Sequence, residues 1–246
     1  MAEATGQEFR VGRVLSTAWA VYMRNFAPFS TVALVLLLPL LFVQLFMLPG
    51  TTIDSEMAPN PAAAIIYAVL SLLLTQLITA TVVFGTIQEM RHHSASTGEA
   101  LIRGLRLALP VLGVVIVASI AVAVGALLLV VPGIILFVMF WVAIPVAVVE
   151  GPGVIDSLKR SAFLTKGNRW RIFGLVIVLW LTMTVISMAI SVAFAAAEAW
   201  AVYAYIDYVL TAFFTLVFAV VSAVGYHDLR LLKDGVDVDT IAAVFD

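Results

Sequence analysis

The sequence predicts an all-α integral membrane protein. Six transmembrane helices form three hairpins, and each hairpin is preceded by an amphipathic interfacial helix on the cytoplasmic side. Composition is the first reason, because 63% of the residues are hydrophobic and 11% are charged. Soluble domains average about 45–50% hydrophobic residues and about 25% charged residues. The placement of charge is the second, since segments that hold Lys and Arg alternate with pairs of long apolar runs that hold none. The 246 residues are therefore interpreted as one polytopic membrane domain.

An amphipathic helix is expected first, over residues 8–26. At about 100° per residue, its basic side carries Arg10, Arg13, Thr17 and Arg24. Its other side carries Val11, Val14, Leu15, Ala18 and Tyr22. This pattern is typical of a helix that lies in the interface with its basic face toward anionic head groups. Residues 28–48 and 61–88 then form the first hairpin, because about 20 apolar residues cross the hydrocarbon layer.

The second unit begins with an interfacial helix over 97–108. Ser96 and Glu99 have capping-box spacing at its start. Residues 110–131 and 133–149 are the next two spans. A single helix through both would measure about 60 Å, twice the hydrocarbon thickness, so Pro132 and Gly133 are predicted to form the turn between them.

The third unit repeats this order. Its interfacial helix covers 153–165, its spans cover 172–197 and 205–226, and a cytoplasmic tail covers 227–246, in which Asp239 is a plausible cap of a short helix. The stretches "AWAVYMRNFAPFSTVALV" and "SAFLTKGNRWRIFGLVIV" align weakly at the same stage of the first and third units. The chain is thus predicted to contain a threefold repeat.

All thirteen Lys and Arg residues precede the first span, follow the sixth, or lie between spans two and three or four and five. The remaining three connections contain none. Because short loops rich in Lys and Arg stay in the cytoplasm, both termini are predicted to be cytoplasmic.

Two stretches carry a resemblance to a known family. They are "VPGIILFVMFWVAIPVAVVEGPGVIDSLKRSAFLTKGNRWRIFG" and "YHDLRLLKDGVD", and they resemble the membrane domain of the glycerophosphoryl diester phosphodiesterase family. The matching positions are Pro132, Gly133, Pro145, Glu150, Ser157, Arg160, Ser161, Leu164, Gly167, Asp228, Leu229 and Arg230. At His227 the family commonly has an aromatic residue. The resemblance implies a six-span protein of the bacterial cytoplasmic (inner) membrane. It implies no hydrolase, because that activity belongs to a separate soluble domain for which this chain has no room.

Charged residues at the span ends are the candidate sites. A carboxylate at a membrane edge is stabilised by a bidentate arginine, so Glu150 is expected to pair with Arg160 or Arg230 and to fasten the surface helices to the span ends. Asp228 is also expected to form a structural ion pair. A head-group or ligand site is the alternative for these four residues.

Metal binding is weighed at Glu89, His92 and His93, whose i, i+3, i+4 spacing places them on one helix face, and at His227. An ordinary polar boundary is the preferred interpretation, so no metal and no cofactor are predicted. Contacts with lipid head groups are predicted for Arg10, Arg13, Arg24, Arg103, Arg106, Lys159, Lys166, Arg169 and Arg171.

Three functions remain open. The preferred one is a non-enzymatic membrane protein that organises or binds lipids or partner proteins at the cytoplasmic leaflet. Its partners would be the phospholipid bilayer and anionic lipids, with a protein partner or a second copy as an open alternative and no nucleic acid. The first alternative is a transporter or channel for a neutral or lipid-like solute, although no ionisable residue lies near the middle of a span. The second is an enzyme acting on lipid head groups, which requires Glu89, His92, His93, His227 and Asp228 to converge.

Overall fold

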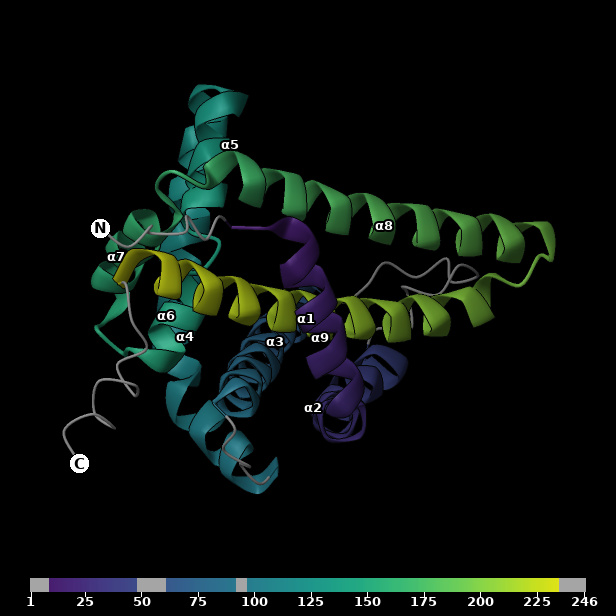
Figure 1. Ribbon diagram of the computed structural model, residues 1–246. Helices are drawn as coiled ribbons and strands as arrows, with labels where there is room; N and C mark the ends of the chain where they lie inside the picture. Colours follow the sequence, from purple (N-terminus) through teal and green to yellow (C-terminus); the bar gives the residue numbers. More distant parts are fainter. Residues whose placement is uncertain (1–8, 48–60, 92–96, 235–246) are drawn as a thin grey trace, which may run out of the picture.

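The computed structural model describes residues 9–47, 61–91 and 97–234, and within these ranges the regular structure is entirely helical (Figure 1). The helices are α1 (Val11–Arg24), α2 (Phe26–Met47), α3 (Pro61–Met90), α4 (Thr97–Leu128), α5 (Val130–Met139), α6 (Ala143–Val149), α7 (Val154–Thr165), α8 (Arg169–Ala196) and α9 (Trp200–Asp234). Among the described residues, six segments are long and apolar enough to cross a membrane, with α5 and α6 together forming the fourth. The predicted helical class and the six apolar helices are therefore confirmed.

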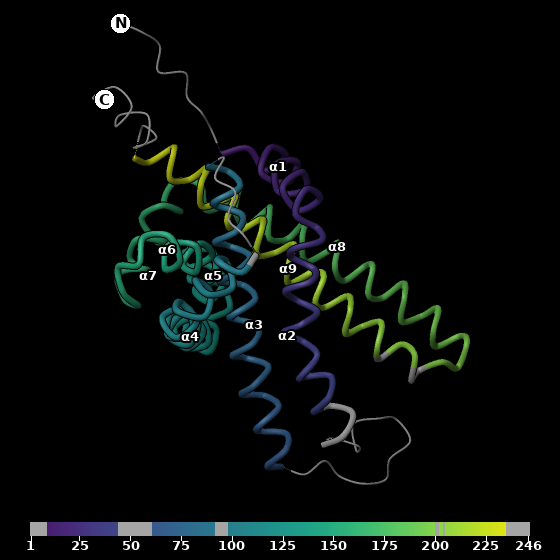
Figure 2. The backbone as a smooth tube through the Cα atoms, turned by 90° about the horizontal axis from the view of Figure 1, so that it is seen from below, coloured from purple at the N-terminus to yellow at the C-terminus, as the bar shows by residue number. Residues whose placement is uncertain are grey.

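Three helical hairpins, α2–α3, α4–α5 and α8–α9, diverge from a common base (Figures 1 and 2). The core lies at this base, where α3 buries residues from Gln76 to Ile87 and α9 buries residues from Leu216 to Leu229. The far halves of the same two helices expose large apolar side chains, such as Ile65 and Val209. The hairpin tips therefore present hydrocarbon to their surroundings, as expected of helices that face lipid.

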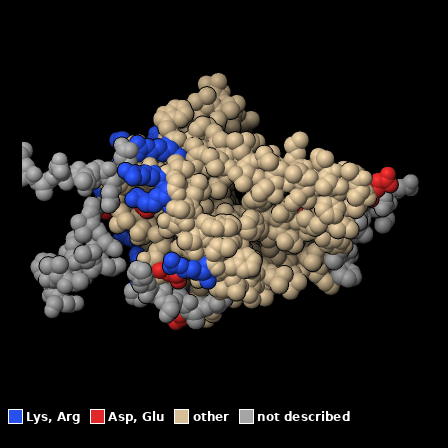
Figure 3. All heavy atoms as spheres, turned by 45° about the vertical axis from the view of Figure 1, so that its right-hand side comes forward, with Lys and Arg blue, Asp and Glu red and all other residues tan. Residues whose placement is uncertain are grey.

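The cations gather at the base, which we name the basic end. It is formed by α1, the last turn of α3, the first turns of α4, helix α7, the start of α8 and the last turns of α9. These segments and the residues that directly flank them carry all thirteen Lys and Arg residues. On the face shown in Figure 3, the basic side chains gather on one side while most of the remaining surface is uncharged. Helix α1 packs its predicted apolar side inward, since Val14, Ala18 and Tyr22 are buried.

Helix α4 is continuous through Pro110, so the predicted separation of a surface helix at 97–108 from a span at 110–131 is wrong. Proline removes one backbone hydrogen bond and kinks a helix, but neighbouring contacts can compensate for that cost. Here α4 packs tightly on α3 before the proline, because a methyl group at Gly104 would overlap the Thr81 hydroxyl. The first and third units retain a separate basic helix, whereas the second has the basic segment fused to its span.

The turn between α4 and α5 lies at Leu129, which is extended at φ −160° and ψ 145°. The predicted turn at Pro132 and Gly133 is therefore wrong. Both residues lie in the first turn of α5, where a proline has no helical hydrogen bond to lose. Gly133 instead permits close packing of the hairpin, because an added Cβ would come within 2.8 Å of the Ala126 Cβ.

Helix α9 extends to Asp234, so the first part of the predicted tail at 227–246 is helical. His227, Asp228 and Arg230 thus lie on a helix at the basic end. The proposed cap at Asp239 falls outside the described residues.

Candidate functional site

Arg160 of α7 is the centre of an ionic cluster at the basic end. Its Nε donates to both carboxylate oxygens of Glu150, at 3.3 and 3.1 Å, and its Nη2 donates to Asp234 at the end of α9. Arg230 Nε lies 3.6 Å from the same Asp234 carboxylate. The Tyr226 hydroxyl donates to Glu150 at 2.8 Å. We name these five residues the clasp, because they join the end of α6 to α7 and α9.

The clasp is partly shielded from water, with side-chain exposures of 26% for Arg160 and 22% for Glu150. Partial burial lowers the pKa of the Arg160 guanidinium, but the hydrogen bonds with Asp234 and Glu150 outweigh this effect, so its pKa is raised overall. Arg160 therefore remains a cation bound to two carboxylates. Of the two arginines weighed for Glu150, the structure places Arg160 against it.

Helix α1 uses two arginines to bind acids on other helices. Arg13 donates through Nε and Nη2 to one carboxylate oxygen of Asp228, at 3.2 and 3.1 Å. Arg24 Nη1 lies 3.8 Å from Glu89 at the end of α3. Asp228 was expected to form a structural ion pair between a surface helix and a span end, and it does so with Arg13, because α1 packs along α9. No sequence rule identifies this pair, which is separated by 215 residues.

The weak metal candidates fall into two groups. His92 and His93 lie outside the described residues, while Glu89 faces Arg24. Over residues 9–47, 61–91 and 97–234, no group of three His, Cys, Asp or Glu side chains is arranged to hold a metal ion.

The fourth apolar segment is broken between α5 and α6, at residues 140–142. Pro145 explains the break, since it has no N–H to donate to the carbonyl of Trp141, and its ring would clash with that carbonyl in a continuous helix. The Met139 carbonyl at the break instead accepts a hydrogen bond of 2.7 Å from the Ser161 hydroxyl of α7. The hydroxyl of Thr165, 3.5 Å from the same oxygen, is also directed toward it. Ser161 and Thr165 are fully buried, so α7 caps the broken span.

The break also presents a tryptophan ring to α9. Trp141 is buried against Gly225, where an added Cβ would lie 2.5 Å from the ring. The sequence offered Pro145 as a possible kink in this span, but it did not indicate the contact between Trp141 and Gly225.

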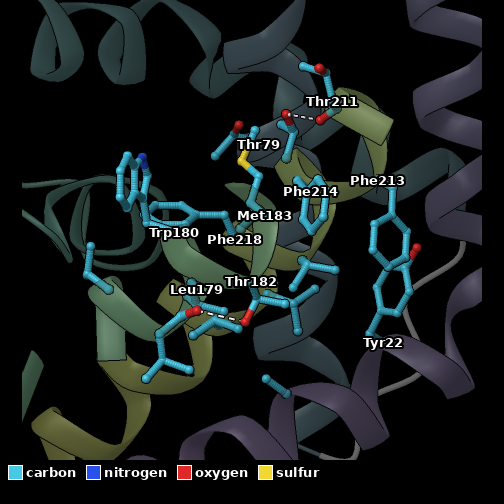
Figure 4. A pocket seen from close by; sticks show the side chains of 18 of the residues that line it. Tyr22, Thr79, Leu179, Trp180, Thr182, Met183, Thr211, Phe213, Phe214 and Phe218 are labelled. Carbon is cyan, nitrogen blue, oxygen red and sulfur yellow. Dashed lines mark hydrogen bonds between the residues drawn. The ribbon is translucent and has the colours of Figure 1, made fainter. Parts of the chain in front are cut away.

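A cavity of about 810 Å³ lies beside α8 (Figure 4). Its walls come from α1, α3, α8 and α9, with single residues from α4, α5 and α6. Aromatic and aliphatic side chains dominate the lining, among them Leu179, Met183, Phe213, Phe214 and Phe218. It is thus an apolar chamber that reaches from beneath α1 into the depth of the bundle.

A smaller cavity of about 300 Å³ lies between α2, α3 and α9. Asp207 lines it and accepts a 3.3 Å hydrogen bond from Tyr203. Three threonines, Thr75, Thr211 and Thr215, line both cavities. The two chambers therefore share a polar wall, which analysis of the sequence did not anticipate.

The nine predicted head-group residues differ in their surroundings. Arg13, Arg24 and Lys159 pair with Asp228, Glu89 and Asp156. Arg171 Nη1 donates to the Phe9 carbonyl at 3.3 Å. Within the described part of the chain, no carboxylate lies within 4 Å of the basic groups of Arg10, Arg103, Arg106, Lys166 and Arg169.

Comparison with known proteins yields one family match. No curated protein and no solved structure matches the chain. The resemblance to the membrane domain of glycerophosphoryl diester phosphodiesterase stays a prediction, because the match is to a different family. The model of the family described as "Domain of unknown function (DUF7847)" matches residues 9–229. Since this range covers most of the sequence, the chain belongs to the DUF7847 family.

Proposed function

We propose that the protein is a non-enzymatic integral membrane protein that gathers anionic lipids at the cytoplasmic leaflet, together with partner proteins that share this surface. The set of five cations without a carboxylate neighbour, within the described residues, is the observation that carries this proposal. These cations extend over α1, α4 and the start of α8, around an uncharged bundle. Each cation near an anionic surface contributes about 1 kcal/mol before screening, so a few together suffice for lipid preference.

The basic end is assigned to the cytoplasm because Lys and Arg are retained on that side during insertion. The resemblance described above supports a bacterial inner membrane. An enzymatic role is less favoured, since two of its five candidate residues, Glu89 and Asp228, face arginines of α1.

Spin-labelled lipids test the proposal, because the fraction immobilised at the protein surface measures preference for phosphatidylglycerol over phosphatidylcholine. We expect the wild-type protein to prefer phosphatidylglycerol severalfold, and R103Q/R106Q to lose much of that preference. High salt should reduce it as well, because it screens exposed charges. The charge-preserving variant R103K/R106K should behave as wild type. Equal immobilisation of both lipids by the wild-type protein would contradict the proposal.

A transporter for a neutral or lipid-like solute is the second candidate, favoured by the two cavities that share Thr75, Thr211 and Thr215. Purification in native-lipid discs separates the two candidates. Bound phospholipid alone supports the first, whereas a discrete small solute supports the second.

A further inference from the structure

We infer that the 810 Å³ cavity is the seat of one acyl chain of an anionic glycerophospholipid, whose phosphate binds beside Arg171 at the basic end. This inference rests on the proposed function and deepens it, because it names the lipid class and a defined site.

The cavity exists because α8 packs loosely. Only 6% of the most apolar stretch of α8 is buried, compared with 44% in α9. Leu179 and Met183 of α8 line the open space together with Phe213 and Phe218 of α9 (Figure 4). An apolar chamber between membrane helices favours hydrocarbon over water, because burying apolar surface is worth about 25 cal/mol per Å².

The length of the cavity suits an acyl chain. The lining residues of α8 run from Val176 to Ile186, which is about 15 Å at a rise of 1.5 Å per residue. An α-helix with its side chains is about 10 Å wide. A single acyl chain is much thinner and can follow the chamber.

Two cations precede lining residues on the α1 and α8 walls of the cavity and favour an anionic head group. Arg171 precedes Val176 by five residues, and its guanidinium lies beside the start of α1, where it binds the Phe9 carbonyl. Arg10 follows Phe9 directly and is exposed. Trp19 lines the cavity and is 55% exposed, as is common for tryptophan at the membrane interface. An apolar interior lined by Trp19, with Arg10 and Arg171 nearby along α1 and α8, matches an anionic amphiphile.

Thr182 and Thr184 offer a matched pair for the test. Both belong to α8, both are exposed, and both hydroxyls donate to the carbonyl one turn earlier, at 2.8 and 2.9 Å. Of the two, Thr182 lines the cavity. Tryptophan at position 182 should therefore fill the seat, whereas tryptophan at position 184 should not.

The experiment reconstitutes each variant in discs of equal phosphatidylglycerol and phosphatidylcholine, then counts the lipids retained after gentle delipidation by native mass spectrometry. We expect wild type, T184W and the isosteric T182V to retain one phosphatidylglycerol. In T182W, the fraction of protein that retains this lipid should be at least tenfold lower. For the single retained lipid, R10Q/R171Q should lose the preference for phosphatidylglycerol. R103Q/R106Q, with the same loss of charge, should keep phosphatidylglycerol as the retained lipid, even though its spin-label preference at the protein surface falls. T182F replaces T182W if the larger ring prevents a monodisperse preparation.

Equal retention by T182W and T184W would overturn the seat while leaving the proposed function to the spin-label measurement. If the wild-type protein retained both lipids equally, the assignment of an anionic head group would be wrong. If the spin-label measurement also showed no preference for phosphatidylglycerol, the proposed function would be wrong as well. A retained small solute in place of phospholipid would overturn the inference in favour of transport.

Discussion

Arg160 lies between two carboxylates from different helix ends, and its geometry suggests that it contributes to stability. Exposed ion pairs are worth about 0–1 kcal/mol, but a hydrogen bond to a charged group that is partly shielded is worth about 1.5–3 kcal/mol. The Glu150 and Arg160 side chains belong to the shielded class, at 22% and 26% exposed. The Lys159–Asp156 pair on the same helix belongs to the exposed class, at 73% and 62%.

Replacing Glu150 with Gln should lower the melting temperature in detergent by several degrees. The substitution removes the charge that binds Arg160 and weakens the acceptor of the Tyr226 hydroxyl. We expect a loss of about 1–2 kcal/mol, since Asp234 still binds Arg160. Thermal unfolding followed by circular dichroism measures the shift. K159Q is the control. An E150Q protein with the same melting temperature as K159Q and wild type would argue against a stabilising clasp.

Individual residues differ in how far the sequence predicts their contacts. Glu150 and Arg160 are ten positions apart, on either side of one short connection, so their proximity follows from local structure. Arg13 and Asp228 meet only because α1 lies along α9, and nothing near either residue signals this.

Among the helices, the broken fourth span depends on α7 for a hydrogen bond at its break. The break at 140–142 leaves the Met139 carbonyl without its usual partner four residues later, because Ala143 N–H donates to Phe140 instead. A polar group left unpaired inside an apolar bundle is costly. Ser161 supplies the missing donor from α7, so the short surface helix is a structural part of the span.

Removing that donor with S161A should destabilise the protein by about 1 kcal/mol, because Thr165 at 3.5 Å can replace only part of the bond. The melting temperature should fall by about 2–4 °C on the scale of soluble proteins of this size. S71A is the control, since the Ser71 hydroxyl bonds only within its own helix, to the Ala68 carbonyl. A loss in S71A as large as in S161A would show that the break does not depend on α7.

Pro110 and Pro145 show why helix bounds were only partly predictable. Both follow apolar residues, and both remove one backbone hydrogen bond. The chain continues as a helix through Pro110 but breaks before Pro145. At Pro110 the packing of α4 on α3 maintains the helix, whereas near Pro145 the hydroxyls of α7 satisfy the broken end. Neither partner is apparent from the residues beside each proline.

For the whole molecule, the divergence of the three hairpins is the main architectural result. Most of the buried core lies toward the basic end, and the larger cavity extends from α1 between α8 and α9. A tightly parallel bundle would bury α8 as well as α9. Loose packing of α8 therefore creates the chamber to which we assign an acyl chain.

Cysteine labelling checks the arrangement across the membrane, and the chain contains no native cysteine to interfere. Glu198 lies in the connection between α8 and α9, and Lys166 lies between α7 and α8. In intact cells, a membrane-impermeant maleimide should label E198C but not K166C. Permeabilised cells should give labelling of both. Labelling of K166C in intact cells, or the absence of E198C labelling in intact cells, would contradict the proposed orientation.

The sequence by itself determined the helical class, the six apolar segments and the grouping of cations, because these follow from composition and from the length needed to cross hydrocarbon. It also determined the amphipathic character of α1 and α7 through the spacing of apolar residues. Only the tertiary structure decided which acid each arginine binds, which proline breaks a helix, and where α8 separates from its neighbours. The physical reason is that these features depend on contacts between residues far apart in the chain, and local patterns carry no information about such contacts.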